Sequence, residues 1–355
     1  MTMVYDVVVI GGGQAGLSMG YYLKQTGLSY IILDNQNVVG DVWRKRYDSL
    51  ILFTPRAYSS LPGLTLKGDP SGFPTKDEIA NYLENYARTF DLPIQSNCHV
   101  KRIQNENDLF IISANEGTVI KTKKVVIATG PFHTSRIPAF AKELPEQVVQ
   151  LHSSQYKNKS QLNEGAVLVV GGGNSGAQIA VELSQTHETY LSVSHKLRFL
   201  PLSIGNKSFF WWCEKLGILQ SNRDSFIGKK VQGKPDPIFG FELKERIKNQ
   251  QIKVKSRTAS IEKDEICFVD QTKIKVQNVI WATGYTQDYS WIDVPELLDE
   301  DGKIMYNRGI TNIEGLYFLG MPWQHRRGSA LLLGVGDDAE YLAKQISKLT
   351  KTHLD

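Results

Sequence analysis

Two glycine-rich segments of this 355-residue chain have the spacing that binds a dinucleotide pyrophosphate. Residues 11–16 read GGGQAG and residues 171–176 read GGGNSG. In each segment the first glycine allows a tight turn, the third lets the backbone approach a pyrophosphate, and the last lets a helix pack closely on a strand. The free N–H groups at the start of that helix attract an anion. The chain is therefore predicted to bind two dinucleotides.

The two segments differ at the end of the strand that should follow each helix. Asp34 stands there after the first segment, where a carboxylate can accept hydrogen bonds from a ribose. Ser194 takes the matching position after the second and is followed by His195, Lys196 and Arg198. An acid that would repel a ribose phosphate is absent, and several phosphate donors follow. We expect FAD at the first segment and NADPH or NADH, with weak preference, at the second.

Both glycine segments belong to longer repeats. Residues 7–36 and 167–196 align without a gap, each with an apolar run, a glycine cluster, a helix-like stretch and a second apolar run. This order predicts a βαβ unit. Residues 123–130 and 277–284 are apolar runs that end in Ala-Thr-Gly, and each should close one unit. The fold class is therefore α/β, with two Rossmann-like domains.

The order of these segments predicts that the second domain is inserted into the first. We expect a discontinuous FAD domain over residues 1–160 and 285–355, and an NAD(P) domain over residues 161–284. Lys76–Phe90 has the apolar stripe of an amphipathic helix. Lys121–Lys124, the densest basic stretch, is expected at a solvated strand edge.

The composition excludes several classes of function and site. The chain has 41 Lys and Arg against 37 Asp and Glu, which does not favour nucleic-acid binding. Its three cysteines are far apart and form no Cys-x-x-Cys, so we expect neither a disulfide framework nor a metal site. No apolar run approaches the ~18 residues of a membrane span, and we expect no leader before the first strand. These features predict a cytoplasmic protein.

The order of the two units and their Ala-Thr-Gly strands resembles the two-dinucleotide-domain flavoproteins over essentially the whole chain. His152 and Tyr156 match the histidine and aromatic positions of the flavin-containing monooxygenase fingerprint, and Glu146 and Val148 take its Phe and Gly positions. Phe73-Pro74-Thr75 and Gly315-Leu316-Tyr317 are also similar to this group. The chain looks most like its compact bacterial branch, the CzcO-like flavoproteins.

The resemblance implies an NAD(P)H-dependent FAD monooxygenase that uses dioxygen. Its small-molecule substrate would be a thioether, an amine or a ketone, oxidised through a flavin hydroperoxide. Residues 331–336 would begin a helix whose N-terminus points at the flavin ring. The residues expected at FAD are Gly11, Gly13, Gln14, Ala15, Gly16, Asp34, Asn35, Trp43, Thr129, Gly130, Gly320 and Leu331. Those expected at NAD(P) are Gly171, Gly173, Asn174, Ser175, Gly176, Ser194, His195, Lys196, Arg198, Thr283 and Gly284.

No catalytic acid–base pair is evident, since flavin chemistry needs none. The candidates for a catalytic role are Trp43, Phe53, His152 and Tyr156. Residues 209–213, FFWWC, could line a substrate entrance or a subunit contact, or pack in the core. Two other functions remain open: a flavoprotein reductase of a quinone or carrier protein, and a non-enzymatic flavin-bearing sensor. The oligomeric state is not defined by the sequence, and a homodimer is compatible with it.

Overall fold

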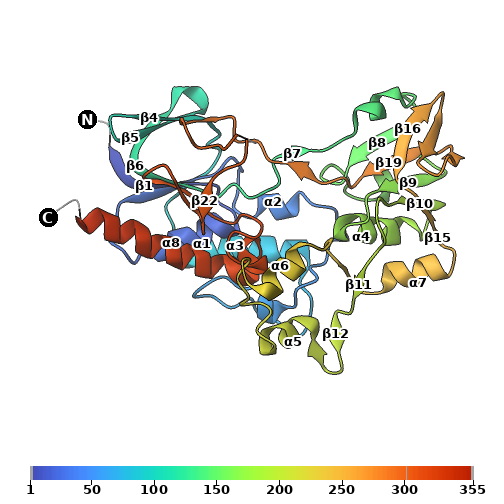
Figure 1. Cartoon of the computed structure of the whole chain (residues 1–355), viewed down its shortest axis with the longest axis horizontal. Coiled ribbons are helices and arrows are strands. Elements are labelled where there is room, and N and C mark those ends of the chain that lie inside the picture. Colours follow the sequence, from blue (N-terminus) through green and yellow to red (C-terminus); the bar gives the residue numbers. More distant parts are fainter. Residues whose placement is uncertain (1–2, 301, 353–355) are drawn as a thin grey trace.

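A computed structural model describes residues 3–300 and 302–352. Figure 1 shows two lobes side by side, each built around its own sheet. One lobe holds both the N-terminal strands and the C-terminal helix, and the other holds the middle of the chain. The predicted α/β class with an inserted second unit is confirmed.

The sheet of the first lobe has ten strands. Five of them run parallel in the order β3-β2-β1-β6-β24, and β4 and β5 extend β6 as an antiparallel meander. The strands are β1 (Val4–Ile10), β2 (Tyr30–Leu33), β3 (Ile94–Gln95), β4 (Val100–Glu106), β5 (Leu109–Ala114), β6 (Val119–Ile127), β21 (Ile292–Asp293), β22 (Tyr306–Asn307), β23 (Ile310–Thr311) and β24 (Leu316–Phe318).

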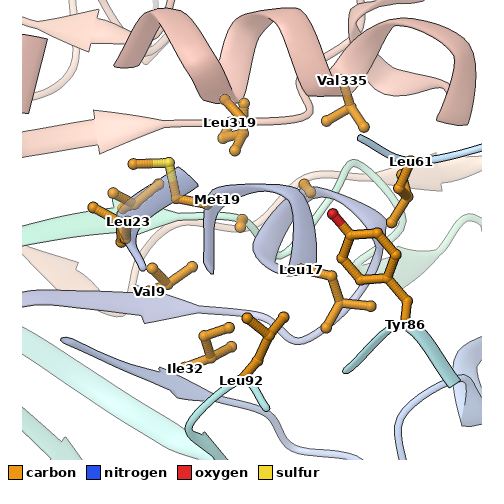
Figure 2. Close-up of a cluster of buried hydrophobic side chains, with 14 of the residues drawn as sticks. Val9, Leu17, Met19, Leu23, Ile32, Leu61, Tyr86, Leu92, Leu319 and Val335 are labelled. Carbon is orange, nitrogen blue, oxygen red and sulfur yellow. The ribbon is translucent and has the colours of Figure 1, made fainter. Parts of the chain in front are cut away.

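Both faces of this sheet are buried, which explains the apolar run Val7–Ile10 of β1. Val7 and Val9 point to one face and contact a cluster formed with the helices α1 (Gln14–Leu23), α3 (Lys76–Thr89) and α8 (Leu332–Thr352). Figure 2 shows Leu17 and Met19 of α1 inside this cluster. The opposite face packs against the meander. The glycine-rich turn before α1 is thereby held between a sheet and a helix.

The sheet of the second lobe repeats this plan. Its five strands are all parallel, in the order β15-β10-β9-β19-β8. Helices cover one face and a three-stranded antiparallel sheet covers the other. The elements are β8 (Val149–His152), β9 (Val167–Val170), α4 (Asn174–Leu183), β10 (Thr189–Ser192), α7 (Glu242–Lys248), β15 (Ile252–Lys255), β16 (Thr258–Glu262), β17 (Glu265–Phe268), β18 (Lys273–Ile274) and β19 (Asn278–Trp281).

Residues 199–241 form an excursion between β10 and α7. It contains short pairs of strands and two helices, which Figure 1 places below the junction of the lobes. Its elements are β11 (Phe199–Leu200), β12 (Ser203–Ile204), β13 (Lys207–Ser208), α5 (Phe209–Lys215), α6 (Phe226–Gln232) and β14 (Ile238–Phe239). The chain crosses between lobes through the antiparallel pair β7 (Thr134–Ser135) and β20 (Tyr285–Thr286).

The second sheet takes one strand, β8, from before residue 161, because β8 pairs with β19. The boundaries at residues 160 and 284 stay predictions. The helix expected over Lys76–Phe90 is present as α3, and Thr75 caps it reciprocally with Glu78. The expectation for Lys121–Lys124 was wrong. These residues lie on β6 inside the sheet, and the Lys124 side chain is buried.

No helix in residues 3–300 and 302–352 is both long and apolar enough to cross a membrane.

Candidate functional site

The residues expected at FAD meet at one edge of the first sheet. Ile10 of β1 lies in register with Leu33 of β2 and Ile127 of β6, and Ile127 pairs with Phe318 of β24. These parallel strands therefore end together. The segments that follow them carry Gly11–Gly16, Asp34–Asn35, Thr129–Gly130 and Gly320. The carboxyl ends of parallel strands are where such sheets bind ligands.

Gly11 and Gly16 are required by the fold itself. A Cβ on Gly11 would lie 2.5 Å from the Ala128 carbonyl oxygen, and Gly11 has φ +108°. A Cβ on Gly16 would lie 1.8 Å from the Gly11 carbonyl oxygen. These contacts bring the turn against β6 and helix α1 against the turn, which leaves no room for a side chain.

Gly13 is a different case, because nothing in the protein requires a glycine there. Its backbone is extended (φ −78°, ψ −168°), which any residue adopts. A Cβ built on it meets no atom within 4 Å. Gly13 is also the N-cap of α1, which has no side-chain cap and no acid in its first turn. An uncapped helix start beside an open backbone fits a pyrophosphate.

Asp34 borders the same space. Its carboxylate accepts a hydrogen bond from the Gln36 N–H (3.1 Å), and a Cβ on Gly12 would lie 2.4 Å from Oδ2. Burial raises the pKa of Asp34, against the lowering effect of the backbone N–H groups around it. The carboxylate is thus close to the glycine turn, as a ribose acceptor must be.

The C-terminal segment completes this edge. The side-chain amide of Gln14 donates to the Ala330 carbonyl oxygen (2.7 Å), so the start of α1 is tied to the residues before α8. Gly320 has φ +82°, and a Cβ there would lie 2.9 Å from that of Ala15. Leu331 is the residue before α8, which begins at Leu332 with no acid in its first turn. The positive end of α8 therefore lies beside the glycine turn.

The second glycine segment has the same geometry. A Cβ on Gly171 would lie 2.2 Å from the Ala282 carbonyl oxygen, and one on Gly176 would lie 2.0 Å from that of Gly171. Gly173 is extended (φ −81°, ψ 178°) and open, with no atom within 4 Å of its Cβ position. Helix α4 also lacks a side-chain cap. The residues present fit a second pyrophosphate.

The acidic neighbour is missing at this second turn. A Cβ on Gly172 would meet the Val193 and Leu197 side chains, where Gly12 meets a carboxylate. Ser194, His195, Lys196 and Arg198 are all exposed, and the Ser194 hydroxyl lies 3.2 Å from His195 Nδ1. Asn174 has another role, because its amide holds the backbone of Pro237 and Phe239.

His152 and Tyr156 are fully buried, and their polar atoms have protein partners. His152 Nε2 lies 3.0 Å from the Gly284 carbonyl oxygen, and burial lowers the pKa of this histidine. The neutral ring therefore ties the end of β8 to the Ala-Thr-Gly turn. The Tyr156 hydroxyl donates to Glu182 on α4 (2.9 Å). Both residues therefore hold elements of the second lobe together.

An apolar pocket of about 410 Å³ lies between the excursion of residues 199–241 and the first lobe. Phe209, Phe210 and Cys213 line it, so three residues of FFWWC do line a cavity. Leu331 lines it too, which joins the pocket to the start of α8. Phe53 is also in its wall. Trp43, on the short helix α2 (Asp41–Arg44), packs against the core of the first lobe instead.

Sequence reasoning missed several residues that line this pocket. Phe239 belongs to the excursion, and Trp323 and Arg327 precede α8. Arg198, which was expected at NAD(P), lines the pocket as well. Arg327 begins the short helix η5 (Arg327–Ala330). No local pattern marks these residues, since contacts between distant segments build the pocket.

The family of this chain is shown by its similarity to known proteins. The family model described as pyridine nucleotide-disulphide oxidoreductase matches residues 8–197. The chain belongs to this family. It is also 57% identical to an uncharacterized CzcO-like oxidoreductase of Geobacillus kaustophilus, over 98% of this chain and 99% of that one.

Two further comparisons concern monooxygenases. A probable indole-3-pyruvate monooxygenase of Arabidopsis thaliana, YUCCA1, is 26% identical over 97% of this chain and 90% of its own length. The solved flavin-containing monooxygenase of Stenotrophomonas maltophilia superposes with a TM-score of 0.82 at 27% identity, covering 99% of this chain and all of that one. The resemblance to CzcO-like and flavin-containing monooxygenase proteins is thereby confirmed.

Proposed function

We propose that this chain is an FAD-dependent monooxygenase that uses NADPH or NADH and dioxygen to oxygenate a small apolar substrate. The observation that carries the proposal is the pair of open glycines. A Cβ on Gly13 or Gly173 would meet no atom within 4 Å, and both glycines start uncapped helices. The similarity to flavin-containing monooxygenases supports the choice of reaction.

The residues divide the work of holding two dinucleotides. Gly13 and the N-terminus of α1 would hold the FAD pyrophosphate, Asp34 would accept from its ribose, and the N-terminus of α8 would face the ring. Gly173 and α4 would hold the nicotinamide dinucleotide, with Ser194 and His195 at its ribose. FAD when bound supplies electron transfer from the nicotinamide to dioxygen. One NADPH, one proton, one dioxygen and one substrate molecule give NADP⁺, water and the oxygenated substrate.

The protein itself would position the two lobes and keep water away from the substrate. Ser49 and Tyr47 of the first lobe hydrogen-bond to Glu182 and Gln178 of α4, which fixes the second lobe against the first. The apolar pocket beside the start of α8 would help to exclude water from a bound substrate. Glu146 and Val148, in place of the usual Phe and Gly, favour a leakier reaction that releases some hydrogen peroxide.

The test is a single reaction in which nicotinamide consumed, peroxide formed and sulfoxide formed are all measured. Small thioethers and ketones serve as substrates. We expect a product yield that varies with the substrate, alongside peroxide. Peroxide equal to nicotinamide for every compound, together with fast quinone or carrier-protein reduction, would contradict the monooxygenase proposal.

Among reductases, one that reduces a disulfide is disfavoured by the cysteines of this chain. Reduction of a disulfide would need a pair of cysteines to exchange with it. Cys98, Cys213 and Cys267 are all free and buried. Quinone or carrier reduction does not need such a pair, and the experiment above separates it from oxygenation.

A further inference from the structure

The pocket beside the start of α8 has a stacked aromatic wall. The ring centroids of Phe53 and Phe239 lie 4.6 Å apart, with an angle of 12° between the ring planes. Those of Phe210 and Phe239 lie 5.5 Å apart, with an angle of 29°. Phe53 comes from the first lobe, and the other two come from the excursion. A flat apolar body, aromatic or aliphatic, would find contact area on this wall.

The charged residues of this pocket are all positive. They are Arg198, Lys230, Lys234 and Arg327, and no acidic side chain is among the described residues that line it. Arg327 forms an ion pair with Asp236 (2.7 Å), which lies outside the lining. A cavity with apolar walls and charge of one sign discriminates between ligands of opposite charge.

The mouth of the pocket continues both properties. Phe226 and Ile227 line the pocket and are 82% and 42% exposed. Lys230 follows them on the same helix, α6, and is exposed as well. An incoming ligand therefore meets an apolar surface with positive charge beside it. Amines would carry the same charge as the pocket.

We propose that this pocket selects apolar carboxylates, with the body of the ligand on the phenylalanine wall and the carboxylate at Lys230 and Lys234. Gly328 and Leu331 line the same cavity, so the body of the ligand would lie toward the start of α8. As a statement about the substrate, this inference rests on the proposed monooxygenase function. As a statement about binding, it can be measured without turnover.

The experiment uses three thioethers of matched shape and different charge: 4-(methylthio)phenylacetate, its neutral amide, and 2-[4-(methylthio)phenyl]ethylamine. Their dissociation constants are measured on the oxidised FAD-loaded enzyme from the change in flavin absorbance. We expect the carboxylate to bind about tenfold more tightly than the amide and the amine to bind weakest, with the difference shrinking at high salt. Equal affinity for the carboxylate and the amide would overturn the inference.

The matched variants are Lys230→Gln and Lys229→Gln, neighbours on α6 of which only Lys230 lines the pocket. Lys230→Gln should weaken carboxylate binding about fivefold and leave amide binding unchanged. Lys229→Gln should change neither. A Lys230→Gln variant that raises the KM for NADPH and keeps the full carboxylate preference would overturn the inference, since the lysine would then serve the cofactor phosphate.

The failures of the two proposals are separable. Tighter binding of the carboxylate without any sulfoxide, from any of the three compounds, supports the assigned ligand class and contradicts the monooxygenase function. Sulfoxide formed from all three, with equal binding constants, supports the function and overturns the ligand class.

Discussion

The turns at Gly11–Gly16 and Gly171–Gly176 are built alike and differ in what faces their second glycine. Gly12 looks onto the Asp34 carboxylate, whereas Gly172 looks onto the Val193 and Leu197 side chains. Under the proposed function, the turn would serve as a general pyrophosphate cradle, and the end of the next strand would determine the choice of dinucleotide. One duplicated unit can serve two cofactors by changing a few side chains outside its glycines.

The largest effects should come from the glycines that the fold requires. Gly16→Ala and Gly176→Ala place a Cβ within 1.8 and 2.0 Å of a carbonyl oxygen. Each should lower the free energy of unfolding by about 3 kcal/mol or more, which is the upper range for overpacking. Thermal unfolding of the cofactor-free protein measures this. Gly13→Ala is the matched control and should leave the melting temperature unchanged; a similar loss there would contradict the distinction.

A smaller effect should follow from removing the acid of the first turn. Asp34→Asn takes away a charged acceptor from the ribose, and a hydrogen bond to a charged group contributes about 1.5–3 kcal/mol. FAD affinity should therefore fall by roughly ten- to a hundredfold. Titration of the cofactor-free protein with FAD tests this, and an unchanged dissociation constant would remove Asp34 from the site.

The second turn should be tolerant of the nicotinamide cofactor. The exposed Ser194 and His195 can bond either a hydroxyl or a phosphate, so kcat/KM for NADPH and NADH should differ by less than roughly a hundredfold, or ~2.7 kcal/mol. Ser194→Asp should lower kcat/KM for NADPH about tenfold and spare that for NADH. A strong preference in the wild-type enzyme, in either direction, would contradict this account of the strand end.

A modest pH effect on cofactor binding is expected at the first turn only, because the second turn has no matching acid. Burial raises the pKa of Asp34 above the ordinary 3.8, so the carboxylate that FAD needs is lost at a higher pH than usual. FAD release should begin as the pH falls toward that raised pKa and should be absent from Asp34→Asn. The stability of the cofactor-free protein should change with pH in the opposite direction to FAD binding. The contribution of Asp34 to stability is present below 3.8 and is lost as the pH rises through the raised pKa.

The repeats could be found from the sequence because their rules are local. The glycine spacing, the apolar strands and the Thr75–Glu78 cap each depend on residues close together in the chain. The burial of Lys124 could not be found this way, since it depends on β6 lying inside the sheet.

The pocket could not be predicted from the sequence for the same reason. Its wall joins Phe53 to Phe239, and β11 pairs with β14 across nearly forty residues. Short strands of two residues leave no periodic pattern. FFWWC signalled an unusual apolar segment, but not which of its residues would face the cavity.

The two open glycines, Gly13 and Gly173, are proposed to serve two different cofactors. The direct measurement compares FAD content and the KM for NADPH in Gly13→Val and Gly173→Val, after both are shown to unfold at the wild-type temperature. We expect Gly13→Val to be folded and colourless. Gly173→Val should be yellow with full FAD and should have a KM for NADPH raised at least about tenfold. Full FAD occupancy in Gly13→Val, or loss of FAD from Gly173→Val, would contradict this proposal.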